Sequence, residues 1–169
     1  MTRSYFILFF TCVIVQSCCF PCIDEDFRNN IEYSAYEPIY WSRADLDSSI
    51  QLKPPQEIIN SGKIYVIGDL LFVGEKREGF HVFDNSDLQN PKKIKFIQVY
   101  GSTDIAVRNN IFYINQATDL ITIQYDFAEE NLKLVKRIAN TFPELRSPDG
   151  YIVHDVPENS VVIDWKLKN

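Results

Sequence analysis

The feature that most constrains the fold of this chain is an internal repeat of about 41 residues. Residues 62–99 read GKIYVIGDLLFVGEKREGFHVFDNSDLQNPKKIKFIQV, and residues 103–140 read TDIAVRNNIFYINQATDLITIQYDFAEENLKLVKRIAN. A unit of this length cannot bury its apolar residues alone, so it stacks on its neighbours. The matched positions are Ile64 with Ile105, Val66 with Val107, Phe72-Val73 with Tyr113-Ile114, and, after a loop one residue shorter, Phe80 with Leu120.

Each unit is expected to form four short strands. In the first unit the β-branched and aromatic residues predict strands near residues 63–67, 70–74, 80–84 and 93–99. Gly68-Asp69 and, in the second unit, Asn109-Asn110 can adopt the positive φ that a tight hairpin needs. Four strands in about 40 residues is the pattern of a β-propeller blade. The sequence therefore predicts an all-β fold, an incomplete β-propeller-like stack of four-stranded blades.

A third repeat is incomplete. We place the first two repeats at residues 61–101 and 102–142, and a partial third at residues 143–169. Either GYIVHDVPENSVVIDW, starting at Gly150, aligns with the start of the first unit, or SVVID, starting at Ser160, continues its third strand. Both alignments give about two and a half repeats, whereas a propeller usually has at least four blades. We expect a chain truncated relative to longer proteins, an oligomer, or an open stack whose sheet edges allow self-association.

Residues 1–17 have the features of a lipoprotein signal peptide. Arg3 supplies a positive charge, and YFILFFTCVIV (residues 5–15) is an apolar stretch shorter than the ~20 residues of a membrane span. Ser17 precedes Cys18, with Val15 three positions before it, and this resembles the lipobox of bacterial lipoproteins. We expect cleavage before Cys18, lipidation of Cys18 and attachment to a membrane. Cleavage without a lipid and an uncleaved anchor remain the alternatives.

The other cysteines do not indicate a metal or redox site. Cys19 and Cys22 have C-x-x-C spacing, but a zinc site needs two more ligands and a thioredoxin-like site needs a βαβ pattern, and the sequence has neither. The acidic run Asp24-Glu25-Asp26 begins six residues after Cys18. It is either an export signal like those of surface lipoproteins in Bacteroidetes or a hydrophilic spacer.

Residues 18–60 are interpreted as a tether followed by an aromatic lead segment. Three of its aromatic side chains are candidates for ligand binding, because Tyr and Trp often act as binding anchors. They are Tyr36, Tyr40 and Trp41. The alternative is that they pack on the rim of the β body. Ser42 followed by Asp45 fits a capping-box-like start and predicts a short helix over residues 43–50.

The repeats resemble the LVIVD repeats of bacterial lipoproteins, many of them from Bacteroidetes. FHVFD (residues 80–84) is a variant of that motif, and DNSDLQNP (residues 84–91) loosely matches the connection that follows it in the family. YEPIYWSRADLDSSI (residues 36–50) is similar to the family's lead segment. The second repeat departs from the pattern, since Gln124 replaces the Asp of the motif. The resemblance implies a β-propeller without established activity. With the lipobox it predicts anchoring to the bacterial outer membrane, at either the cell surface or the periplasmic face.

Charge and motifs argue against several function classes. The formal net charge of −6 repels phosphate backbones, so we expect no nucleic-acid partner. The chain contains no G-x-S-x-G, H-E-x-x-H, Walker or G-x-G-x-x-G motif. Asp84-Asn85-Ser86-Asp87 lacks the spacing of a calcium loop and predicts a turn. We therefore expect no enzymatic activity, no metal and no cofactor.

Isolated titratable residues do not form a catalytic pattern. His154 and Asp155 are neighbours, but adjacent strand residues face opposite ways. His81 is expected to be solvent-facing or hydrogen-bonded within a strand. Three further carboxylates, Asp104, Asp119 and Asp164, are dispersed, and nothing in the sequence brings them together.

The predicted lipidation of Cys18, the β repeats and the lack of catalytic motifs together predict a lipid-anchored envelope protein. Its β-repeat body is expected to be an interaction or structural module. Its partner is expected to be a protein or a glycan. A carbohydrate-handling enzyme or enzyme subunit, and a non-functional fragment of a longer propeller protein, are the alternatives.

Overall fold

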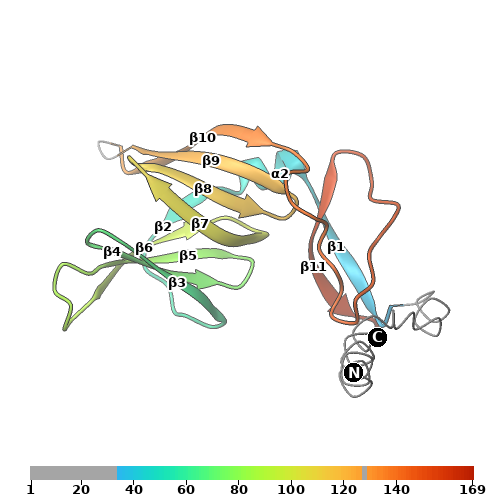
Figure 1. Ribbon diagram of the computed structural model, residues 1–169, viewed down its shortest axis with the longest axis horizontal. Helices are drawn as coiled ribbons and strands as arrows, with labels where there is room; N and C mark the ends of the chain where they lie inside the picture. The colour runs from blue at the N-terminus through green and yellow to red at the C-terminus, as the bar shows by residue number, and fades with distance from the viewer. Residues whose placement is uncertain (1–33, 127–128) are drawn as a thin grey trace, which may run out of the picture. The chain divides into compact units, whose positions relative to one another are not determined.

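A computed structural model of the protein describes residues 34–126 and 129–169. The predictions for the signal peptide, Cys18, the C-x-x-C pair and the acidic run Asp24-Glu25-Asp26 lie outside these residues. Residues from Ser34 to Asn169 form one compact unit. They fold mostly into β-strands, arranged in three antiparallel sheets (Figure 1). Within the described ranges none of the three sheets closes on itself.

The first repeat forms most of a five-stranded sheet. Its strand order is β2-β6-β5-β4-β3. The strands are β2 (Gln51–Lys53), β3 (Ser61–Ile67), β4 (Leu70–Glu75), β5 (Gly79–Asp84) and β6 (Lys92–Gln98). The four strands predicted for this repeat are therefore confirmed to within two residues. Gly68 links β3 to β4 with a φ of 58°, the positive value expected at this hairpin.

The second repeat forms a four-stranded sheet of order β10-β9-β8-β7. Its strands are β7 (Ser102–Arg108), β8 (Ile111–Gln116), β9 (Asp119–Asp126) and β10 (Asn131–Ile138). Asn109 and Asn110 join β7 to β8 with φ values of 48° and 62°. Two consecutive positive φ values give the hairpin turn that Asn tolerates better than most residues.

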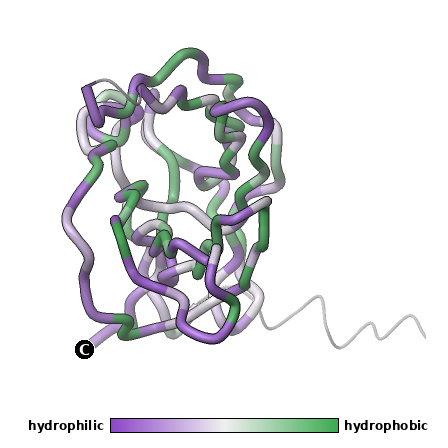
Figure 2. The backbone as a smooth tube through the Cα atoms, turned by 90° about the vertical axis from the view of Figure 1, so that its left-hand side faces the viewer, coloured by the Kyte–Doolittle hydropathy of each residue, from purple (hydrophilic) through white to green (hydrophobic). Residues whose placement is uncertain are grey.

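The main core lies between these two sheets. Each sheet contributes the apolar side chains of one face, and Figure 2 shows hydrophobic and hydrophilic residues alternating along the strands, as expected for sheets buried on one side. Phe72 of β4 and Phe112 of β8 meet edge to face, with ring centroids 6.0 Å apart. Ile114, Ile121 and Ile123 are completely buried here. The two repeats thus stabilise each other by stacking.

The third sheet joins the two ends of the described chain. β1 (Tyr36–Ser42) pairs antiparallel with β11 (Ser160–Leu167). Residues Leu46, Val161 and Ile163 form a second, smaller core with Trp41 and Tyr100 packed against it. The segment after β10 therefore pairs with the lead segment rather than with further strands of its own repeat.

The partial third repeat does not form a sheet of its own among the described residues. The strand that one alignment places at Gly150 is absent, and this segment forms a turn in which the Ser147 N–H donates to the Tyr151 carbonyl at 2.9 Å. The Asp149 carboxylate of this turn accepts from the distant Ala35 N–H at 2.8 Å. β11 begins at Ser160, where both alignments place a strand, but it pairs with β1, so its register within a third repeat stays a prediction.

The helix predicted after the aromatic segment is confirmed. α2 spans Arg43–Ser48, and Ser42 is its N-cap, whose hydroxyl accepts from the Asp45 N–H at 3.1 Å. The helix ends two residues earlier than predicted. Leu46, completely buried, fixes it to the second core. In the described part of the chain no helix is long and apolar enough to cross a membrane.

Candidate functional site

Strand β1 separates the three aromatic residues that the sequence singled out. Side chains alternate along a strand, so Tyr36 and Tyr40 face one side of the β1–β11 sheet and Trp41 faces the other. Trp41 packs on Tyr100, with ring centroids 5.0 Å apart, beside the second core. Trp41 therefore has packing contacts, whereas Tyr36 and Tyr40 lie on the sheet face away from this core.

Further aromatic residues lie on the Tyr40 face. Trp165 is paired with Pro38, which shares the face of Tyr40. The Tyr151 ring lies 6.3 Å from the Trp165 ring and 6.5 Å from the His154 ring, both in edge contacts. The Trp165 indole N–H donates to the Leu145 carbonyl at 3.1 Å. These contacts hold the segment before β11 against the sheet.

The Tyr40 hydroxyl lies in an acidic environment. Burial raises the pKa of Tyr40 above its usual value, and the neighbouring acidic groups of Tyr151, Asp155 and Glu144 raise this pKa further. The phenol therefore stays protonated at neutral pH and can both donate and accept a hydrogen bond. Glu144 and Asp155 add acceptor oxygens close to it.

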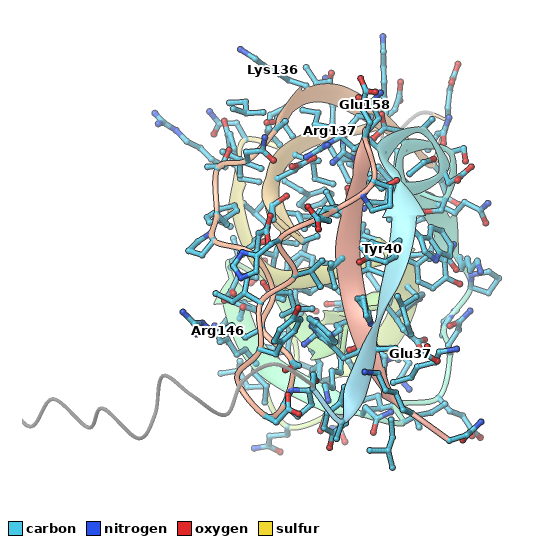
Figure 3. The ribbon with its side chains drawn as sticks, turned by 90° about the vertical axis from the view of Figure 1, so that its right-hand side faces the viewer. Glu37, Tyr40, Lys136, Arg137, Arg146 and Glu158 are labelled. Carbon is cyan, nitrogen blue, oxygen red and sulfur yellow. The ribbon has the colours of Figure 1, made fainter. Side chains whose placement is uncertain are left out.

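A cleft of about 210 Å³ lies next to this group. Tyr40 does not line the cleft, but its strand partner Val162 and its acidic neighbour Glu144 do, and we therefore call it the Tyr40 cleft. Arg43 and Glu158 also line it. Figure 3 shows Tyr40 at the β1–β11 sheet and Glu158 on the same side of the molecule. The cleft thus combines acidic and basic side chains with apolar ones.

A buried ion pair holds one side of the Tyr40 cleft in place. Asp119 at the start of β9 has no exposed surface and accepts from Arg43 at 2.7 and 3.0 Å. Burial opposes ionisation of Asp119, but hydrogen bonds from Arg43, the Asn140 N–H and Arg137 outweigh it and lower the pKa to about 2. Asp119 is therefore a permanent carboxylate that orients Arg43, and its proton is not available for acid catalysis.

Arg137 extends this network to the helix. Its guanidinium donates to Asp119 at 2.8 Å, to Gln116 at 2.6 Å and to Asp47 of α2 at 3.0 Å. One arginine of β10 therefore links β8, β9 and α2. Asp47, Gln116 and Asp119 therefore all have a hydrogen-bond donor where the helix packs near the four-stranded sheet. Without Arg137 these polar groups would lack this partner in a partly buried place.

The three dispersed aspartates occupy different places. Asp104 accepts from Lys63 and from the Tyr65 hydroxyl, the latter at 2.9 Å, between β3 and β7. Asp164 lies 3.0 Å from Arg77, which holds β11 to the β4–β5 turn. They do not converge with Asp119 on one site, and each of the three is paired with a basic residue.

His81 is completely buried and bonded. Its Nε2 lies 3.0 Å from Glu75 Oε2, and Glu75 also accepts from the backbone N–H groups of Ile59 and Asn60. Burial would raise the pKa of Glu75, but His81 and these N–H groups lower it overall. Of the two readings for His81, the structure supports the hydrogen-bonded one. His154, in contrast, lies exposed in the segment before β11.

The residues of the Tyr40 cleft could not be grouped from the sequence. Arg43, Glu144 and Glu158 line the cleft but are far apart along the chain, and the folding of the chain brings them close. Asp119 and Arg137, which hold Arg43 in place, come from two further strands. The described residues contain no cluster of three metal-ligating side chains. In comparisons with known proteins, no family model, no curated protein and no solved structure matches this chain. The resemblance to LVIVD repeats therefore stays a prediction from its motifs.

Proposed function

We propose that the described body is a non-catalytic binding module that takes one neutral sugar unit of a glycan in the Tyr40 cleft. The observation that carries this proposal is the convergence of Glu144, Glu158 and Arg43 on one small cleft, with Tyr40 next to Glu144. Sugar hydroxyl groups form hydrogen bonds with carboxylate and guanidinium groups. A volume of about 210 Å³ is below the ~300–1,000 Å³ of sites for drug-sized ligands, so it suits a single ring.

The polar groups of the Tyr40 cleft are held ready for a ligand. Arg43 uses Nε and Nη2 to bind Asp119 and Asn140, which leaves its Nη1 group outside these bonds. A side chain fixed in this way loses little rotamer freedom when a ligand binds. The Asp119 carboxylate stays ionised and hydrogen-bonded, so it does not supply a proton for catalysis. This favours a binding role over an enzymatic one.

The test is a glycan array probed with the wild-type protein and two variants. Glu158→Ala is expected to weaken binding at least tenfold, since it removes a lining carboxylate that can accept from sugar hydroxyl groups. Glu57→Ala is the matched control, because Glu57 is exposed and does not line the cleft. Equal binding by Glu158→Ala, no binding by the wild type, or release of a cleaved sugar would contradict the proposal.

We also propose that the body is attached to a bacterial outer membrane through a lipid on Cys18. The support is in the sequence: the short apolar stretch, Ser17 before Cys18, and the acidic run that follows. Mass spectrometry of protein extracted from membranes should find acyl chains on Cys18. Cys18→Ser should abolish lipidation and Cys19→Ser should not. An unmodified Cys18 in the wild type would overturn this part.

For the fold, we propose that the five-stranded and four-stranded sheets are successive blades of an incomplete propeller-like stack. Three facts support this. The two repeats are offset by 41 residues, their strands are ordered sequentially as β3 to β6 and β7 to β10, and their sheets pack face to face. The β1–β11 sheet is formed by one strand that precedes the two blades along the chain and one that follows them.

A further inference from the structure

A second, larger cleft lies away from the Tyr40 cleft. Its volume is about 360 Å³, and it is bordered by the start of β3, the β4–β5 turn and the start of β7. Polar and basic side chains line it, together with Phe80 and the backbone of several glycines. We call this cleft the Ser102 cleft, and its lining includes Lys63, Lys76, Arg77 and Ser102.

Ser102 carries an unsatisfied polar group in the wall of this cleft. The residue is only 3% exposed, and its buried Oγ has no hydrogen-bond partner among the described residues. Leaving a buried hydroxyl unpaired costs about 1–3 kcal/mol. A ligand oxygen in the cleft would remove this cost by accepting from the Ser102 hydroxyl.

The charged residues of the cleft favour an anion. Lys76 is exposed and makes no ion pair in the described part of the chain. Lys63 is already paired with Asp104, and Arg77 with Asp164 at 3.0 Å, while Arg77 Nη1 also donates to the Ile163 carbonyl at 3.0 Å. Glu75 is the one acidic residue in the lining, and its carboxylate is engaged by His81 Nε2 and two backbone N–H groups. Lys76 is therefore the lining residue whose positive charge is available to an anion.

Comparison with the second repeat indicates that the strands of a repeat do not require these basic residues. The positions matching Lys63, Lys76 and Arg77 at the offset of 41 are Asp104, Ala117 and Thr118. The second repeat forms its strands and hairpins without a basic residue at any of them. Lys63 and Arg77 have structural contacts with β7 and β11, whereas Lys76 has no ion pair among the described residues, as expected for a residue of a site.

We propose that the Ser102 cleft binds a small organic anion. Lys76 Nζ and the Ser102 hydroxyl bind its carboxylate or phosphate group, and the remainder of the ligand packs on Phe80 and the glycine backbone. This site is independent of the neutral-sugar site at Tyr40, and either can fail without the other.

The experiment titrates the ¹⁵N-labelled full chain with glucuronate, glucose 6-phosphate and glucose, one at a time. The backbone amides of Gly62, Gly74 and Gly79, which line the cleft, are the reporters. At least one of the two anions is expected to shift these amides saturably, and which one binds tells whether a carboxylate or a phosphate is preferred. Glucose should leave them unchanged. Shifts by glucose equal to those by the anions, or no shifts with either anion, would overturn the proposal.

Variants make the assignment specific. Ser102→Ala and Lys76→Ala are each expected to weaken anion binding about tenfold, the size of one lost hydrogen bond to a charged group. Lys76→Arg should retain most of the affinity, since it keeps the charge. Lys133→Ala, at an exposed lysine of β10 outside the cleft, is the control for overall charge. Equal losses in Lys133→Ala and Lys76→Ala would show a non-specific charge effect and contradict the site.

Discussion

At the scale of single residues, Asp119 contributes both to the proposed binding site and to the stability of the fold. It orients Arg43 toward the Tyr40 cleft and at the same time neutralises Arg137 within the fold. Both guanidinium groups are mostly buried, with 21% and 12% of their side chains exposed. Removing the carboxylate would leave two partly buried cations without their shared partner.

Asp119→Asn is therefore expected to lower the free energy of unfolding by about 3–5 kcal/mol, the usual cost of breaking a buried ion pair. Urea denaturation followed by circular dichroism measures this change. Asp69→Asn, at an exposed position of the β3–β4 turn, should change stability little. A loss below 1 kcal/mol in Asp119→Asn would mean that the network is not buried as described.

The pH dependence of stability provides a second test of Asp119. Its pKa is about 2 in the folded chain and has an ordinary value of 3.8, so the carboxylate stabilises the fold above pH 4 and loses this contribution as the pH falls to 2. This contribution is about 2 kcal/mol. The stability difference between wild type and Asp119→Asn should shrink over this range. A difference that stays constant from pH 5 to pH 2 would contradict the assignment.

Gly79 shows how one backbone position fixes a hairpin. Its φ is +147°, and a Cβ there would lie 2.0 Å from the Ile97 carbonyl oxygen. Gly79→Ala should therefore prevent native pairing of β5 with β6, visible as loss of the cooperative thermal transition. Gly68→Ala, at a position with positive φ but open space, should cost only about 1 kcal/mol. Similar stabilities for the two variants would contradict the close approach at Gly79.

At the scale of elements, α2 links the aromatic strand to the rest of the chain. It follows β1 directly, packs Leu46 into the second core and places Asp47 against Arg137. With six residues it is too short to be stable alone, so its cap and its packing must both contribute.

Ser42→Ala removes the N-cap hydroxyl and should destabilise the protein by about 1 kcal/mol. The reason is that the Asp45 N–H loses its side-chain acceptor. Ser48→Ala, at the last residue of the same helix, is the control and should have a smaller effect. Thermal unfolding of both variants measures the difference. A larger loss in Ser48→Ala than in Ser42→Ala would contradict the capping role.

The comparison of sequence and structure is also clearest for elements. The strands, the Asn109-Asn110 turn and the Ser42 cap were predictable, because periodicity, turn residues and capping residues act over a few positions. The pairing of β1 with β11 was not, since it depends on which distant strand offers the better partner. The Tyr40 cleft was not predictable, because its lining residues come from distant segments with no local pattern, and Tyr40 itself only lies next to it.

At the scale of the whole molecule, the open sheet edges determine how the chain can associate with other copies of itself. The β10 edge carries Lys133, Lys136 and Arg137, and charged edges resist pairing with another strand. The β3 edge instead exposes Ile64 and Val66, with 65% and 64% of their surface accessible. The predicted self-association should therefore use β3.

Val66→Lys should shift any concentration-dependent association toward monomer, whereas Val135→Lys on β10 should not. Sedimentation velocity over a hundredfold range of concentration measures both variants against the wild type. A wild type that stays monomeric throughout would contradict self-association, and equal effects of the two variants would contradict the choice of edge.

The most direct test of the binding function uses the two tryptophans of the chain. Trp165 lies on the Tyr40 side and donates to Leu145 in the wall of the Tyr40 cleft, whereas Trp41 packs on the opposite face against Tyr100. Their indole N–H signals can be followed by NMR during titration with methyl glycosides of glucose, galactose, mannose and N-acetylglucosamine. We predict that at least one glycoside shifts the Trp165 signal and leaves the Trp41 signal in place. No shift with any of them, or a shift of Trp41 alone, would contradict a sugar site at Tyr40.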